Sequence, residues 1–110
     1  SISIEMMVRS AQDPGSSRVQ HQLLSTLEGP TQFSFRVPEN ADAVNYGALF
    51  TELKSSHDAT LFGVAQSALG DDLLLNAPSK YQVDPRTILY FMSSRRIEPS
   101  EINWSKLSSK

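Results

Sequence analysis

The sequence predicts an α+β fold, in which an N-terminal helical hairpin is followed by a small lobe with the element order β-α-β-β-β. Three observations lead to this prediction. Apolar residues recur at helical spacing before Pro30, the period changes to two after Gln32, and the later strands come as a run rather than alternating with helices. We expect a helical hairpin over residues 1–30, a lobe over 31–98 and a C-terminal tail over 99–110.

Residues 1–30 carry two amphipathic stripes separated by the turn sequence Asp13-Pro14-Gly15. A serine before the second stripe can cap a helix, and Gly29-Pro30 can end it. A helical hairpin alone cannot bury both stripes, so we expect them to form the interface of a homodimer or a higher even oligomer. The residues predicted for this dimer interface are Ile4, Met7, Val8, Val19, Leu23 and Leu27.

The lobe is predicted from shorter patterns. Its elements are a half-buried strand at 33–37, a helix at 46–53, and apolar strands at 60–65, 73–75 and 87–92. The loop containing Gly70 suits a hairpin, and Asp84-Pro85 marks a turn before the last strand. The chain after Trp104 is expected to fray. Alternation and helical spacing predict a core of Phe35, Leu49, Phe50, Leu53, Leu61, Leu74, Leu89 and Phe91.

Composition narrows the possible functions. The net charge is −2 and the ten basic residues are scattered, which disfavours nucleic acid as a partner. The absence of cysteine excludes disulfides, thiolate metal sites and cysteine nucleophiles, and suits a reducing cytoplasm. No apolar run approaches the ~20 residues that span a bilayer, and the N-terminus lacks the pattern of a signal peptide. If the parent protein sits in a membrane, its spanning part lies outside this sequence.

The residues also lack the pattern of an enzyme. The five glycines are isolated, so neither a dinucleotide fingerprint nor a phosphate-binding loop can be drawn. His21 and His57 lie on different predicted elements, without the spacing of a metal pair. His57 is expected to interact with the last carbonyls of its helix. No serine lies in a Gly-x-Ser-x-Gly motif. We therefore expect a non-catalytic domain without a cofactor.

Two pairs of charged residues are candidate ligand sites. Arg95 and Arg96 follow the last strand and could bind a phosphate or carboxylate, although a charged strand end is the more ordinary explanation. Asp71 and Asp72 lie at the hairpin tip and could contribute to a divalent-cation site, although a solvated turn is the better explanation because Ca²⁺ takes about 6–8 oxygen ligands. Because neither pair completes a site, we expect any effector to bind between two copies of the lobe.

The order of short motifs from residue 33 to residue 97 resembles one known family. The matching segments are FRVP at 35–38, YGALFTEL at 46–53, DATLFGV at 58–64, LLNAP at 74–78 and YQVDPRTILYFM at 81–92. Together they resemble the C-terminal lobe of domains that regulate conductance of K⁺ (RCK, TrkA-C-like), with the Castor and Pollux branch of ion channels as the nearest pattern. Ala77 stands where the family often has proline, and Pro85-Arg86 replaces its usual Gly-Asp. The second departure removes a flexible glycine from the expected turn.

The resemblance implies a cytoplasmic regulatory domain of a potassium channel, at the cytoplasmic face of the cell membrane as part of a larger protein. In such proteins a helical hairpin crosses to a partner subunit, which matches the pattern in residues 4–28. The domain would couple binding of a small molecule or divalent cation to pore gating, with a nucleotide-binding N-terminal lobe and a transmembrane pore as its partners. The equivalent lobe of a potassium or cation carrier or antiporter is an alternative. An accessory domain of an enzyme or transcription factor is a third.

Overall fold

The computed structural model describes residues 21–22 and 31–108 of the chain. The chain divides into two units, residues 1–32 and 33–110, and the second is the lobe discussed below. The predicted helical hairpin lies outside the described residues, apart from residues 21–22, which are helical. The same holds for the six residues predicted to form the dimer interface.

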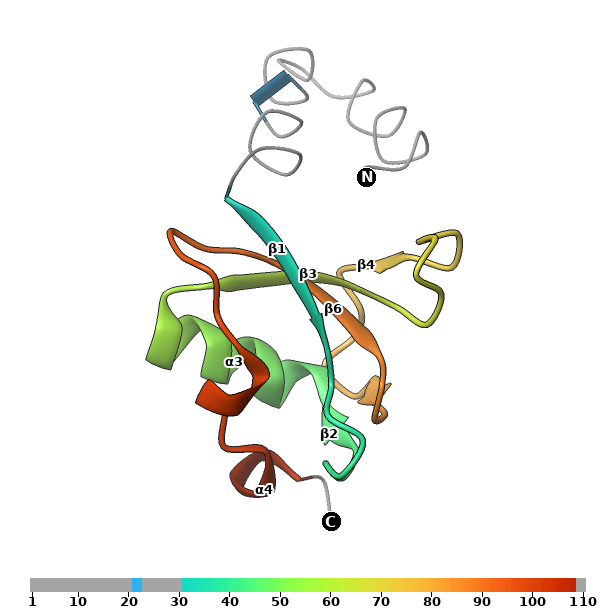
Figure 1. Cartoon of the computed structure of the whole chain (residues 1–110), viewed down its shortest axis with the longest axis vertical. Coiled ribbons are helices and arrows are strands. Elements are labelled where there is room, and N and C mark those ends of the chain that lie inside the picture. The colour runs from blue at the N-terminus through green and yellow to red at the C-terminus, as the bar shows by residue number, and fades with distance from the viewer. Residues whose placement is uncertain (1–20, 23–30, 109–110) are drawn as a thin grey trace. The chain divides into compact units, whose positions relative to one another are not determined.

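The lobe is a small α+β domain built on a mostly antiparallel sheet (Figure 1). The main sheet has the strand order β1-β6-β3-β4, where the strands are β1 (Gln32–Arg36), β6 (Ile88–Met92), β3 (Thr60–Ala65) and β4 (Leu74–Leu75). A second, two-stranded sheet pairs β2 (Val44–Asn45) with β5 (Gln82–Val83). Neither of these two-residue strands was predicted, because their pairing joins segments 39 residues apart in the sequence.

The strands β3 and β6 form the centre of the sheet. Their antiparallel register pairs Leu61 with Phe91 and Val64 with Leu89, with a bulge between Leu61 and Gly63. The bulge shifts the alternation by one residue, so Leu61 and Val64 both reach the core face although three positions separate them. The continuous apolar run predicted at 60–65 therefore forms a strand at those residues.

Helix α3 (Tyr46–His57) packs against β3 and β2 and covers this face of the sheet. Its buried residues are Tyr46, Leu49 and Leu53, which follow one another at i, i+3 and i+7. The helix ends where Asp58 adopts a left-handed conformation, with φ of 53°. The amide groups at this end bond back to Leu53 and Lys54, which satisfies carbonyls of the last turn.

The core prediction is right for five residues and wrong for two. Leu49, Leu53, Leu61, Leu89 and Phe91 are buried, and Phe35 packs against them while only partly buried. Phe50 is 38% exposed, because it lies on the flank of α3, where it contacts only the ring of Tyr46 among the aromatic residues described. Leu74 is also 38% exposed, because β4 is a two-residue edge strand with no neighbour beyond it in the described sheet.

The last part of the described chain, residues 97–108, closes over the lobe and is here called the C-terminal clasp. It contains the 3-10 helix η1 (Pro99–Glu101) and the helix α4 (Trp104–Leu107). Ile97 and Ile102 are buried, and Ser108 forms an isolated bridge with Val44 of β2. The expectation of a frayed end after Trp104 is thus wrong, because its apolar residues pack on the core.

Candidate functional site

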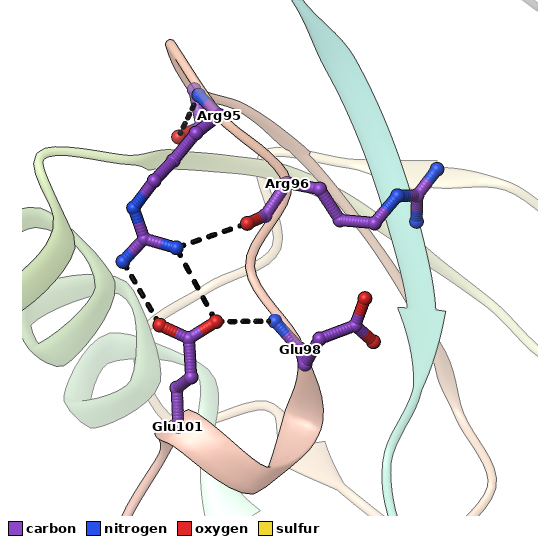
Figure 2. Close-up of polar contacts among 5 residues, drawn as sticks. Arg95, Arg96, Glu98 and Glu101 are labelled. Carbon is purple, nitrogen blue, oxygen red and sulfur yellow. Dashed lines mark hydrogen bonds and ion pairs between the residues drawn. The ribbon is translucent and has the colours of Figure 1, made fainter.

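The clasp holds one of the predicted ligand residues, Arg95, in a two-pronged ion pair (Figure 2). Arg95 donates from Nη2 to Oε1 of Glu101 at 2.9 Å and from Nη1 to Oε2 at 3.3 Å. Nη1 also donates to the carbonyl of Arg96 at 3.0 Å. The fork geometry that could grip an external anion is therefore already occupied by a carboxylate of the same chain.

Glu101 is held from a second side. Its Oε2 accepts a hydrogen bond from the backbone N–H of Glu98 at 2.9 Å (Figure 2). The hydrogen bond from Arg95 lowers the pKa of the Glu101 carboxyl below its ordinary value, and the Glu98 amide lowers it further. Both groups stabilise the charged form, so the carboxylate is fixed although it lies at the surface.

Arg96 points the other way. Its guanidinium lies over the ring of Phe33 on β1, 5.1 Å from the ring centroid, and Figure 2 shows it in front of that strand. The structure therefore separates the two arginines that are adjacent in sequence, and they do not form one joint anion cradle. Arg96 is the more available of the two, because its side chain is exposed and faces an aromatic ring instead of a carboxylate.

The predicted cation residues lie in the loop between β3 and β4. Asp72 accepts backbone hydrogen bonds from Gln66 at 2.8 Å and from Ser67 at 3.1 Å, which closes the loop and lowers the pKa of its carboxyl. Asp71 is exposed beside it. Within residues 21–22 and 31–108, no three acidic, histidine or cysteine side chains gather as metal ligands. Asp72 thus stabilises its own loop, a role that its position beside Asp71 in the sequence does not indicate.

A groove of about 760 Å³ lies along the exposed side of α3, between the turn at Ser79 and the clasp. None of the candidate residues predicted from the sequence lines this groove. Its lining is rich in hydroxyl groups and carries two lysines, and consists of Asn45, Gly47, Ala48, Thr51, Glu52, Ser55, Ser56, Ser79, Lys80, Lys106 and Leu107. The signal available in the sequence was the spacing of small and hydroxyl residues at 48, 51 and 55, which marks one helix face.

Two contacts shape this groove. Gly47 lies so close to Ser79 that a Cβ atom at position 47 would be 2.8 Å from the Ser79 Cβ, so a glycine is needed there. At the other end, Lys106 Nζ lies 3.8 Å from Oε1 of Glu52, whose side chain is only 15% exposed. The groove can therefore form polar contacts with a ligand, and Lys80 contributes an exposed cation at its rim.

His57 is the last residue of α3. Its Nδ1 atom is buried and has no hydrogen-bond partner in the described part of the chain.

The comparisons with known proteins leave the family open. The chain matches no protein-family model, no curated protein and no solved structure. Among the residues that the structure describes, no helix is both long enough and apolar enough to cross a membrane.

Proposed function

We propose that this chain is a regulatory, dimerising, ligand-sensing lobe of a potassium channel, which couples effector binding to gating of a pore. The observation that carries the proposal is the order of elements from β1 to β6. Strand, helix, strand, hairpin, turn and strand follow one another at the segments whose residues resemble the RCK C-terminal lobe. The short strands β2 and β5 are additions to the order expected from that resemblance.

The turn before β6 adds support, because it forms in spite of the missing glycine. Thr87 N–H donates to the Asp84 carbonyl at 3.2 Å, and Arg86 takes the left-handed conformation with φ of 70°. A residue with a side chain is strained in that conformation. Arg86 N–H donates to the Val37 carbonyl at 2.8 Å, which ties the turn to the end of β1. The left-handed residue is Arg86, at the position of the family's usual aspartate, while Pro85 stands where the family has glycine, so these hydrogen bonds close the turn without a glycine.

The arrangement of the candidate residues suggests how an anionic effector would compete with Glu101 for Arg95. An anion binding at Arg95 has to displace the Glu101 carboxylate, whereas Arg96 is open to an anion without breaking an ion pair. Displacement of Glu101 would also free the Glu98 amide and loosen the clasp. Binding of an anionic effector would in this way alter the lobe itself, which is what a sensor requires.

A thermal-shift experiment on the full chain tests the proposal. The chain is melted with Ca²⁺, with adenine and guanine nucleotides, and with cyclic dinucleotides, each at millimolar concentration. A ligand present at 100 times its Kd should add ~2.7 kcal/mol to the free energy of unfolding and raise the Tm by several degrees. The proposal is wrong about sensing if none of the three classes raises the Tm.

Substitutions locate the response. The double variant Arg95→Ala, Arg96→Ala should abolish a shift caused by an anionic ligand and leave a Ca²⁺ response unchanged. Asp71→Asn should do the reverse, and it is preferred to Asp72→Asn because Asp72 closes its own loop. Lys54→Ala, which removes a cation from the exposed side of α3, serves as the control for lost positive charge.

A further inference from the structure

The longer open edge of the main sheet is strand β1. Of the two edge strands, β1 has five residues and β4 has two, and β1 has β6 as its only neighbour in the described sheet. An edge strand presents a row of backbone donors and acceptors that can pair with another strand. The chain from 32 to 36 contains no proline and a single charge, Arg36, so few of the devices that block such pairing are present.

The hydrogen bonds at the end of β1 show to which side its backbone N–H and C=O groups point. Val37 N–H donates to the Thr87 carbonyl at 2.8 Å, and the Val37 carbonyl accepts from Arg86 N–H at 2.8 Å, so both groups of Val37 point toward the β6 side. The ring of Phe33 lies 5.9 Å from that of Phe91, which fits the same antiparallel register. Because the direction alternates along a strand, the groups of Gln32, Ser34 and Arg36 point to the open edge.

We propose that two copies of the chain pair through β1, antiparallel and about a two-fold axis at Ser34, into one continuous sheet. This register uses the three outward-pointing residues on each strand. Ser34 lies opposite Ser34 of the second copy, and Gln32 lies opposite Arg36 of the second copy. Between them Phe33 lies opposite Phe35 of the second copy, an aromatic cross-strand pair of the kind that stabilises sheets.

This register places no two like charges directly opposite each other. In this register each Arg36 faces a neutral amide, and the two Arg36 positions are about four residues apart along the strands, roughly 14 Å. That separation exceeds the Debye length of about 8 Å at physiological ionic strength, so their repulsion is screened. Arg36 is also held by its own lobe, because Nη1 donates to the Arg86 carbonyl at 2.8 Å. The Arg36 side chains of two copies therefore do not prevent the strands from pairing.

Cysteine cross-linking tests this register directly. The chain has no cysteine, so Ser34→Cys introduces a single thiol on the proposed axis. A hydrogen-bonded antiparallel pair has Cα atoms about 5.5 Å apart, within the roughly 4.4–6.8 Å range of disulfides. Ser55→Cys, on the exposed side of α3, is the matched control for random collisions. We expect the Ser34→Cys dimer to form at least about tenfold faster, since pairing raises the effective thiol concentration. Equal rates would refute the pairing.

A proline at the same position provides the second arm. Ser34→Pro removes the outward N–H that the second copy needs, and an edge strand tolerates proline where the N–H faces solvent. We expect the variant to retain the circular dichroism of the wild type and to sediment with weaker self-association at a given concentration. If Ser34→Pro folds and associates as strongly as the wild type, β1 is not the interface. The proposal does not rest on the regulatory function, and association that depends on Leu23 instead of Ser34 would refute β1 pairing while leaving that function intact.

Discussion

Glu101 is the residue through which the clasp is bonded to Arg95 and to its own backbone at Glu98. It receives two hydrogen bonds from Arg95 and one from the amide of Glu98, and it is itself the last residue of η1. None of these partners is more than six residues away in the sequence, so the arrangement is local. A surface carboxylate that accepts three hydrogen bonds has a structural role. Protonation of Glu101 should weaken these bonds and destabilise the clasp.

The pH dependence of Glu101 follows from this arrangement. The folded-state pKa lies below the ordinary value of 4.5, so its contribution to stability is present above the unfolded-state pKa and is lost as the pH falls through the folded-state pKa. Arg95→Ala should raise the pKa of Glu101 toward its ordinary value, as measured by NMR titration of the carboxyl carbon. Arg36→Ala removes an arginine that does not contact Glu101 and should leave the pKa unchanged. An unchanged Glu101 pKa in Arg95→Ala would contradict the assigned cause.

Asp71 and Asp72 provide a matched pair for testing a loop contact. Asp72→Asn weakens the acceptor of the Gln66 and Ser67 amides, because a neutral amide oxygen is a poorer acceptor than a carboxylate. We expect faster hydrogen exchange at these two amides. Asp71→Asn changes the neighbouring charge without touching the bonds and should leave their exchange as in the wild type. Equal acceleration in both variants would point to net charge as the cause.

At the scale of elements, α3 packs on the core through only one of its faces. Leu49 is fully buried and Phe50 is 38% exposed, although both are large apolar residues in the same turn. Leu49→Ala should lower the free energy of unfolding by about 2–5 kcal/mol, since it removes side-chain atoms that the core surrounds. Phe50→Ala should have a smaller effect, because part of its ring is already in water. Urea denaturation of both variants decides the order, and a larger loss for Phe50→Ala would contradict the observed helix face.

The elements that could be predicted are those whose signal is local. The strand Thr60–Ala65 lies in one continuous apolar run, and the helix beginning at Tyr46 follows a regular spacing to Leu53. The strands β2 and β5 could not be found in this way, because Val44 and Val83 are defined as strand only by pairing with each other. The clasp could not be predicted because its few apolar residues show no helical or strand periodicity in the sequence.

The candidate site was less predictable than the fold. The sequence placed Arg95 beside Arg96 and Asp71 beside Asp72, but adjacency does not fix where side chains point. Arg96 turned out to face Phe33, a residue 63 positions earlier in the chain, and no local pattern reports such a contact. The groove likewise depends on the approach of Ser79 to Gly47, which only the folded backbone brings about.

At the scale of the whole molecule, the division of the chain at residue 32 coincides with the first residue of β1. The apolar stripe that includes Leu23 and the open edge of β1 therefore belong to different units and can be tested separately. Leu23→Asp places a charge in the predicted helical stripe. We expect it to weaken association measured by sedimentation equilibrium, as charges are depleted from the cores of interfaces. A wild-type chain that sediments as a folded monomer at high micromolar concentration would contradict the predicted dimer.

Trp104 gives the lobe a built-in optical reporter. It is the only tryptophan of the chain, its Nε1–H donates to the Pro99 carbonyl at 3.0 Å, and its ring meets that of Phe35 edge-on at 6.3 Å. One indole thus senses η1, α4 and the edge strand at once. Its emission should shift to the red when the clasp lifts and water reaches the ring, whether acid, an anionic ligand or denaturant is the cause. Opening and closing of the clasp can accordingly be followed in solution by tryptophan fluorescence, without attaching a dye.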